Sequence, residues 1–106
     1  MITWITGNSK SGKTTLASKM RTNEVILDGD ALRKVWTDLD LSEAGRREQN
    51  LRAARLSLML SEQGFDVIVA TICPYKNLRE EVQKITGCKF IYLDGGKSGE
   101  DYPYEK

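Results

Sequence analysis

The sequence predicts an α/β domain in which helices alternate with the strands of one parallel sheet. Short apolar segments at 2–6, 25–27, 65–71 and 90–93 are separated by segments whose apolar residues recur at helical spacing. The segment at 65–71 is almost continuously apolar, which is typical of a strand covered on both faces. Strands that alternate with helices form right-handed βαβ units, so a parallel sheet is expected.

Four helices are expected between and after these strands. They are placed over 16–20, from Asp30 onward, from Ser42 to Gln63, and over about 77–86. Asp30 and Ser42 are interpreted as N-caps, because their side-chain oxygens accept hydrogen bonds from first-turn amides. Gly64 and Gly87 are expected to end the helices that precede them. Residues 94–106 show no periodicity and are expected to form an irregular tail.

The segment between the first strand and the first helix has the G-x-x-x-x-G-K-[ST] spacing of a P-loop. Backbone amides of such a loop surround the β-phosphate, Lys13 would reach the β- and γ-phosphates, and the Thr14 hydroxyl would take a position on Mg²⁺. An ordinary surface turn is the alternative, but the strand–loop–helix context favours the P-loop. The predicted ATP contacts are Gly7, Asn8, Ser9, Lys10, Ser11, Gly12, Lys13, Thr14 and Thr15. We therefore expect a nucleotide-binding protein with ATP and Mg²⁺ as cofactors.

Length and composition bound the function. The 106 residues fit one domain, 1–106, with a formal net charge of +1 and no basic block, which argues against nucleic acid or a membrane as the main partner. We expect neither a signal peptide nor a membrane span. The two cysteines fit no metal spacing, so a reducing cytoplasm is the expected location. The absence of histidine excludes histidine-based catalysis.

Asp28 and Asp30 follow the second strand. Ligands of parallel sheets bind beyond the carboxyl ends of the strands, so these carboxylates should face the phosphates. Phosphoryl transfer requires metal neutralisation and a carboxylate that orients or deprotonates the attacking hydroxyl. Two aspartates separated by one glycine suit those roles. The alternative is a turn residue at Asp28 and a plain helix cap at Asp30.

The long helix from Ser42 carries several arginines. Arg47 and Arg52 each follow a glutamate by four residues and are interpreted as exposed ion pairs on a solvated face. Arg46 has no acidic partner at that spacing, and it shares a face with Gln49 and Asn50. Such a face suits an anionic, hydrogen-bonding substrate, although a structural role is equally compatible with the spacing.

The third strand leads into Ile72-Cys73-Pro74-Tyr75, which should open onto the same crevice as the P-loop. Cys73 has no base beside it in this segment, so a packing role is favoured over a reactive thiol. Tyr75 and Trp36 either stack on a base or pack at the rim, and packing is the commoner use of such rings.

Several ordered segments together resemble the adenylylsulfate (APS) kinase family. They are Leu27-Asp28-Gly29-Asp30-Ala31-Leu32-Arg33, Asp38-Leu39-Asp40-Leu41-Ser42, Arg46-Arg47-Glu48-Gln49 and Val67-Ile68-Val69-Ala70-Thr71-Ile72-Cys73-Pro74-Tyr75. The resemblance runs from residue 2 to about 93. It implies a P-loop NTPase fold, a three-layer α/β/α arrangement with four parallel strands in the order 2-3-1-4.

The resemblance also implies an enzyme of sulfate activation. Such a kinase transfers the γ-phosphoryl group of ATP to the 3′-hydroxyl of adenosine 5′-phosphosulfate and yields PAPS. Its implied catalytic residues are Lys13, Asp30 and Asp28, and Thr14 and Asp30 are the implied metal ligands. The implied acceptor site comprises Asp28, Asp30, Arg33, Leu41, Arg46, Gln49, Ile72, Cys73 and Pro74.

Some positions depart from the family pattern. Leu41 replaces an aromatic residue, Gln49 replaces Asn, Cys73 replaces Ser, and the chain passes from Leu93 into 95–105 without the family's lid or fifth strand. Two other functions therefore stay open: a kinase for another hydroxyl-bearing nucleotide or metabolite, and a nucleotide-binding protein that does not catalyse. A homodimer in which the partner covers the site is a further expectation, because lids exclude water.

Overall fold

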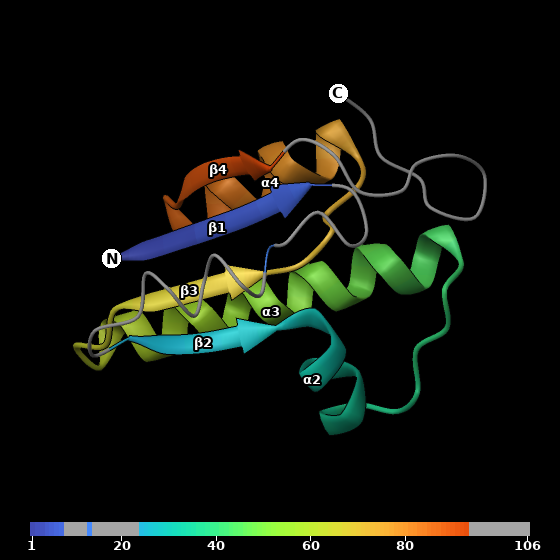
Figure 1. Cartoon of the computed structure of the whole chain (residues 1–106), viewed down its shortest axis with the longest axis horizontal. Coiled ribbons are helices and arrows are strands. Elements are labelled where there is room, and N and C mark those ends of the chain that lie inside the picture. The colour runs from blue at the N-terminus through green and yellow to red at the C-terminus, as the bar shows by residue number, and fades with distance from the viewer. Residues whose placement is uncertain (8–12, 14–23, 94–106) are drawn as a thin grey trace.

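A computed structural model of the chain describes residues 1–7, 13 and 24–93. Its strands are β1 (Ile2–Gly7), β2 (Val25–Asp28), β3 (Val67–Ala70) and β4 (Lys89–Leu93). All neighbouring strands run parallel, in the order β2-β3-β1-β4 (Figure 1). The predicted α/β class, the parallel sheet and the strand order 2-3-1-4 are confirmed.

The described helices are α2 (Gly29–Val35), α3 (Glu43–Glu62) and α4 (Lys76–Thr86). The expected helix over 16–20 and the tail at 94–106 lie outside the described residues. The predicted N-cap of α3 is confirmed, since the Ser42 hydroxyl accepts a hydrogen bond from the Gly45 amide at 3.1 Å.

The predicted start of α2 is wrong by two residues. Asp28, and not Asp30, is the N-cap, and its carboxylate accepts a hydrogen bond of 3.1 Å from the amide of Ala31. The reason is backbone conformation: Asp28 is still extended at φ −89° and ψ 135°, whereas Asp30 already lies in the first helical turn.

The third strand is shorter than the apolar run at 65–71 predicts. Gly64, at φ +96°, ends α3, and the amide of Phe65 still donates to the carbonyl of Leu60 at 3.2 Å. Phe65 is 45% exposed and lies before the ladder, which begins at Val67. An apolar run therefore marks the strand here but not its first residue.

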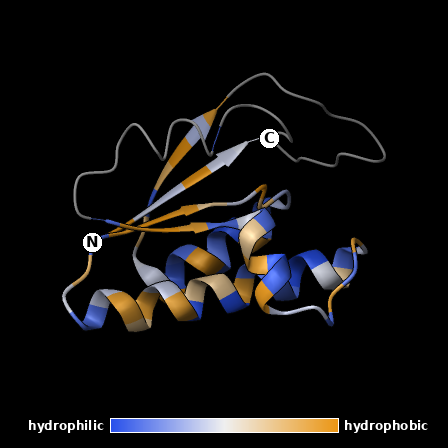
Figure 2. Cartoon of the chain, turned by 60° about the horizontal axis from the view of Figure 1, so that its bottom comes forward, coloured by the Kyte–Doolittle hydropathy of each residue, from blue (hydrophilic) through white to orange (hydrophobic). Residues whose placement is uncertain are grey.

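The main core lies between the sheet and the helices. It contains Trp4, Val67 and Val69 from the sheet, together with buried residues of α3 and α4 such as Ala54 and Leu78. The helical ribbons lie together on one side of the strands (Figure 2). The opposite face of the sheet carries a second apolar cluster: Ile5, Ile68 and Ala70. None of the described helices is long and apolar enough to cross a membrane.

The strand ends that carry the predicted site lie at one edge of the sheet. Asp28 pairs in register with Ala70, and Ala70 pairs with Ile5, so β2, β3 and β1 end side by side. The side chain of Thr6 joins two of these ends directly, because its hydroxyl donates to the Ile72 carbonyl at 2.7 Å. The segments after the three strands therefore leave the sheet together.

Candidate active site

Lys13 is buried at this edge of the sheet, with 9% of its surface exposed. Its ammonium group donates a hydrogen bond of 3.3 Å to the carbonyl of Gly7. Burial lowers the pKa of Lys13, and the nearby carboxylates of Asp30 and, to a smaller extent, Asp28 act in the opposite direction. The structure thus brings together the three residues that the sequence predicts as catalytic.

Asp28 and Asp30 have different surroundings although only Gly29 separates them. The Asp28 carboxylate caps α2, whereas the Asp30 side chain lies in the exposed first turn. A Cβ atom added at Gly29 would lie 3.5 Å from the Ala70 carbonyl, so this turn lies against the end of β3.

The two carboxylates suit a magnesium ion that also binds phosphates. Mg²⁺ in kinases usually takes one or two carboxylates, with phosphate oxygens and water in its other positions. Asp28 and Asp30 supply such carboxylates beside Lys13. In the part of the chain that the structure describes, no group of three or more His, Cys, Asp or Glu side chains is placed to hold a metal.

Arg46 lies in the first turns of α3 and is half-buried. Its carbonyl accepts a hydrogen bond of 2.8 Å from the side-chain amide of Asn50. Asn50 accepts from the hydroxyl of Thr71 at 2.6 Å, and that hydroxyl accepts from the Trp4 indole at 3.0 Å. Among residues 1–7, 13 and 24–93, the Arg46 guanidinium has no hydrogen-bond or ion-pair partner. Its backbone is anchored, and its charge is available to a ligand.

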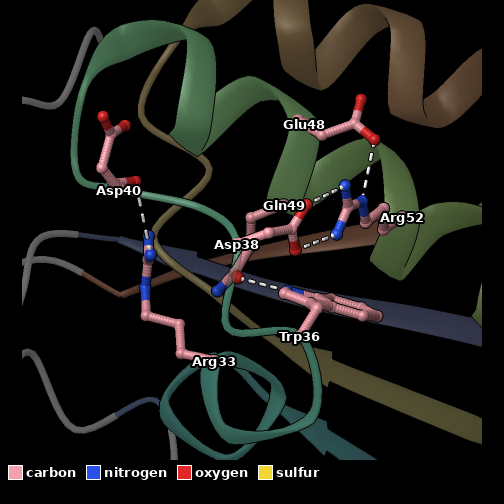
Figure 3. Close-up of polar contacts among 7 residues, drawn as sticks. All are labelled: Arg33, Trp36, Asp38, Asp40, Glu48, Gln49 and Arg52. Carbon is pink, nitrogen blue, oxygen red and sulfur yellow. Dashed lines mark hydrogen bonds and ion pairs between the residues drawn. The ribbon is translucent and has the colours of Figure 1, made fainter.

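Gln49 is not exposed as a substrate contact would be. Only 4% of its surface is exposed, and its carbonyl oxygen accepts a hydrogen bond of 2.7 Å from the Trp36 indole (Figure 3). Its amide nitrogen donates to the carbonyl of Gly29 at 3.1 Å. Both ends of the Gln49 side chain are therefore engaged within the protein. Asn50, predicted on the same face, is also buried.

Arg33 lies in α2, and Leu41 lies in the segment 36–42 that joins α2 to α3. The guanidinium of Arg33 donates to the backbone carbonyl of Asp40 at 3.5 Å (Figure 3). Leu41 is 64% exposed in the part of the chain that the structure describes. Its place in the acceptor site stays a prediction.

Arg52 has more partners than its helical spacing predicts. The expected pair with Glu48 forms at 2.8 Å. In addition, its guanidinium donates to both carboxylate oxygens of Asp38, at 2.8 and 2.9 Å, and lies 5.8 Å from the centre of the Trp36 ring. The hydrogen bonds from Arg52 hold the pKa of Asp38 below its usual value. The predicted pair with Glu48 is confirmed, and the contacts with Asp38 and Trp36 add to it.

Arg47 likewise does more than pair with Glu43, although that pair forms at 3.0 Å. Its guanidinium lies 4.7 Å from the centre of the Tyr75 ring and donates to the side chain of Asn77 at 3.1 Å. It therefore links α3 to the start of α4. Helical spacing identifies only the partner on the same helix, so sequence reasoning missed these contacts.

Cys73 is fully buried, which confirms the predicted packing role. Burial raises the pKa of its thiol to about 12. Its backbone is left-handed, at φ +41°, and its carbonyl accepts a hydrogen bond of 2.8 Å from Arg79. Pro74 is buried beside it, and the Ile72 carbonyl is occupied by Thr6. Of the three predicted acceptor contacts in this segment, Ile72 is half-buried, whereas Cys73 and Pro74 are buried.

Part of the predicted ATP site falls outside the described residues. These positions are Asn8, Ser9, Lys10, Ser11, Gly12, Thr14 and Thr15. Of the P-loop residues, the structure describes Gly7 and Lys13.

Comparison with known proteins agrees with this arrangement of motifs. A model of the adenylylsulphate kinase family matches residues 1–94. The chain belongs to this family. Its relatives include the adenylyl-sulfate kinase of Buchnera aphidicola, which is 36% identical over 97 residues, covering 84% of this chain and 47% of the relative. The probable adenylyl-sulfate kinase of Pyrococcus abyssi is 38% identical over 92 residues, covering 79% of this chain and 53% of the relative.

Solved structures of the adenylylsulfate kinase family share the fold. The Mycobacterium tuberculosis APS kinase in complex with AMPPNP and APS is 30% identical and has a TM-score of 0.73, covering 88% of this chain and 60% of that chain. This is a P-loop kinase fold, as the sequence predicts. The chain spans about half the length of the curated relatives it matches.

Proposed function

We propose that the chain is an ATP-dependent kinase that phosphorylates the 3′-hydroxyl of adenosine 5′-phosphosulfate. The observation that carries this proposal is the buried Lys13 ammonium beside the carboxylates of Asp30 and Asp28. Membership of the adenylylsulfate kinase family supports it. The acceptor would be held near Arg46, whose guanidinium has no hydrogen-bond or ion-pair partner within the described residues.

ATP would bind through the P-loop, Gly7 to Thr15. Lys13 would contact the β- and γ-phosphates, and Thr14 and Asp30 would hold Mg²⁺, which neutralises the charge that develops on the transferred group. The burial of Lys13 strengthens its attraction for phosphate, because water screens the ammonium charge poorly there. Binding of a phosphate would also replace the solvation that the ammonium group has lost.

Asp30 would orient the 3′-hydroxyl and accept its proton while the hydroxyl oxygen bonds to the γ-phosphorus and the bond to the β-phosphate oxygen breaks. Its exposed position in the first turn of α2 suits this role. Asp28 would hold that turn in place as the helix cap.

Arg33 and Arg46 would bind the phosphosulfate group, because a guanidinium donates paired hydrogen bonds to such anions. Leu41 would pack against the adenine. Ile72, Cys73 and Pro74 would border the acceptor through their backbone.

A kinase for a different hydroxyl-bearing nucleotide or metabolite is the second candidate. It is favoured by the acceptor-side features that depart from the family pattern: an exposed aliphatic Leu41 and a Gln49 side chain engaged by Trp36 and Gly29. A nucleotide-binding protein without catalysis is the third candidate. We place the chain in a reducing cytoplasm, since Cys73 and Cys88 are free thiols. A homodimer stays a prediction.

The deciding experiment measures transfer of labelled γ-phosphate from Mg·ATP to adenosine 5′-phosphosulfate. Reactions without the acceptor, without Mg²⁺ and with other hydroxyl-bearing nucleotides serve as controls. Formation of PAPS that requires both ATP and Mg²⁺ supports the first function. Transfer only to another acceptor supports the second, and ATP binding without any transfer supports the third.

A further inference from the structure

The side chain of Gln49 joins the two ends of α2. Its amide nitrogen donates to the carbonyl of Gly29, which lies between Asp28 and Asp30 at the start of the helix. Its oxygen accepts from the indole of Trp36, the C-cap residue of the same helix. One side chain on α3 therefore contacts both the start and the end of α2, a helix of seven residues; Figure 3 shows the contact with Trp36.

The Trp36 ring that Gln49 holds is fixed from a second side by Arg52. The Arg52 guanidinium lies 5.8 Å from the ring centre and donates two hydrogen bonds to the carboxylate of Asp38. Arg52 also forms an ion pair with Glu48, with 2.8 Å between Nε of Arg52 and Oε2 of Glu48. The segment that leaves α2 is thus attached to α3 at Trp36 and at Asp38.

The same segment carries groups that the proposed function assigns to the acceptor. Asp40, whose carbonyl accepts from Arg33, lies two residues beyond Asp38, and the exposed Leu41 follows it. Displacement of Trp36 would therefore move the segment that carries Asp40 and Leu41. Displacement of Gly29 would move the carboxylate of Asp30.

We propose that Gln49 is a positioning residue of this kinase, acting through Trp36 and Gly29 and not by contact with the acceptor. It sets the first turn of α2, with Asp30, against the segment that carries Leu41. The proposal rests on the proposed function for its catalytic consequence. Its structural basis is the burial of Gln49, at 4% exposed, and the engagement of both ends of its amide.

Two single variants and their double variant distinguish the hydrogen bond of Gln49 with Trp36 from its hydrogen bond with Gly29. Trp36→Phe removes the hydrogen bond to Gln49 and keeps an aromatic ring below Arg52. Gln49→Met removes both hydrogen bonds and keeps the length of the side chain. The double variant removes nothing further from this pair. Gln63→Met is the matched control, because Gln63 is exposed at the end of the same helix.

For each variant, we would measure kcat, the KM for adenosine 5′-phosphosulfate, the equilibrium affinity for ATP and the melting temperature. We expect Gln49→Met to lower kcat/KM for the acceptor about ten- to hundredfold, because small displacements of reacting groups have effects of this size. Trp36→Phe should produce a smaller loss of the same kind, and the double variant should match Gln49→Met. Affinity for ATP should change less than about twofold in all of them, since Lys13 is untouched.

A direct contact with the acceptor gives a different pattern. Gln49→Met would then raise the acceptor KM, while Trp36→Phe left both kcat and KM at wild-type values, and this result would overturn the proposal. Losses in the two single variants that multiply in the double variant would also overturn it, because they would show independent actions. A fall in ATP affinity parallel to the fall in melting temperature would indicate general destabilisation and contradict a positioning role.

Amide hydrogen exchange tests the positioning independently of the reaction. In Gln49→Met, we expect faster exchange in peptides covering 29–42, with unchanged exchange in α4 and β4; Gln63→Met should match wild type. Unchanged exchange at 29–42 would refute the positioning role. If wild type transfers no phosphate to adenosine 5′-phosphosulfate while exchange changes as expected, the proposed function fails and the positioning contact stands.

Discussion

Lys13 donates a hydrogen bond of 3.3 Å to the carbonyl of Gly7, the last residue of β1. This contact holds a largely buried ammonium group at the strand edge where Asp28 and Asp30 also lie. A buried cation that is only partly compensated by carboxylates is well suited to receive an anion. Under the proposed function, this arrangement would receive the phosphates of ATP.

Lys13→Ala should abolish nucleotide binding or turnover. The substitution removes the cation that would contact the β- and γ-phosphates, and a loss of about a hundredfold or more in kcat/KM is expected. Calorimetric titration with Mg·ATP and a transfer assay measure the effect. Lys84→Ala, an exposed lysine at the end of α4, is the control. An ATP affinity equal to that of wild type would refute the P-loop assignment.

Substitutions of Asp28 and Asp30 should have different effects on stability and on activity. Asp28→Ala removes the cap of α2 and should lower the free energy of unfolding by about 1 kcal/mol as well as reduce activity. Asp30→Asn should leave stability within about 0.5 kcal/mol of wild type and still reduce transfer by about a hundredfold or more. Urea unfolding and initial rates give both quantities. Equal activity of Asp30→Asn and wild type would remove Asp30 from the reaction.

The elements and their order were accessible from the sequence because they depend on local patterns. The cap at Ser42 and the stops at Gly64 and Gly87 locate α3 and α4, and the apolar run at 65–71 locates β3. The boundaries of these elements were harder to predict. The first residue of β3 depends on pairing with the neighbouring strand, and this pairing begins at Val67 and not at Phe65. The cap of α2 depends on backbone conformation, which selects Asp28 over Asp30. Chain order and alternation thus predict topology better than they predict ends.

For the site, the sequence identified which residues gather at the strand edge but not which are used inside the fold. Arg46 and Gln49 share a helical face, yet Gln49 is engaged by Trp36 and Gly29, whereas the Arg46 guanidinium has no partner in the described part of the chain. The partners of Gln49 lie 13 and 20 positions away. Spacing within one helix carries no information on contacts of that range, so tertiary packing decides the role.

Arg46→Ala should weaken binding of the acceptor and spare ATP. The Arg46 side chain is unpaired in the described structure, so its removal leaves no buried partner unsatisfied, and the melting temperature should change little. We expect the acceptor KM to rise about tenfold or more, as for loss of a charge-assisted contact to an anion. Arg55→Ala, exposed on the same helix, is the control. An equal loss of ATP and acceptor affinity would indicate a structural role.

Gly45→Ala should destabilise the start of α3, although alanine normally stabilises a helix. An added Cβ would clash with the carbonyl oxygen and the carboxylate of Asp40, so the segment before the helix must shift. We expect a loss of about 1–3 kcal/mol in the free energy of unfolding. Gly29→Ala is the matched control, because its Cβ would make ordinary contacts of 3.5 Å, and its effect should stay within about 1 kcal/mol. Equal effects of the two substitutions on urea unfolding would contradict the steric explanation.

The Cys73 thiol should make stability fall in alkaline solution. Its pKa is raised from 9.0 to about 12 by burial, so above pH 9 the unfolded chain releases a proton that the folded chain retains. The stabilisation that this thiol contributes is complete below pH 9 and is lost as pH rises toward 12. Cys73→Ala should therefore flatten the decline in the free energy of unfolding measured by urea titration between pH 8 and about 10.5. A decline of equal slope in wild type and variant would show that the thiol is not responsible.

The intact protein should also resist iodoacetamide at Cys73, because this side chain is fully buried, and should react once urea unfolds the chain.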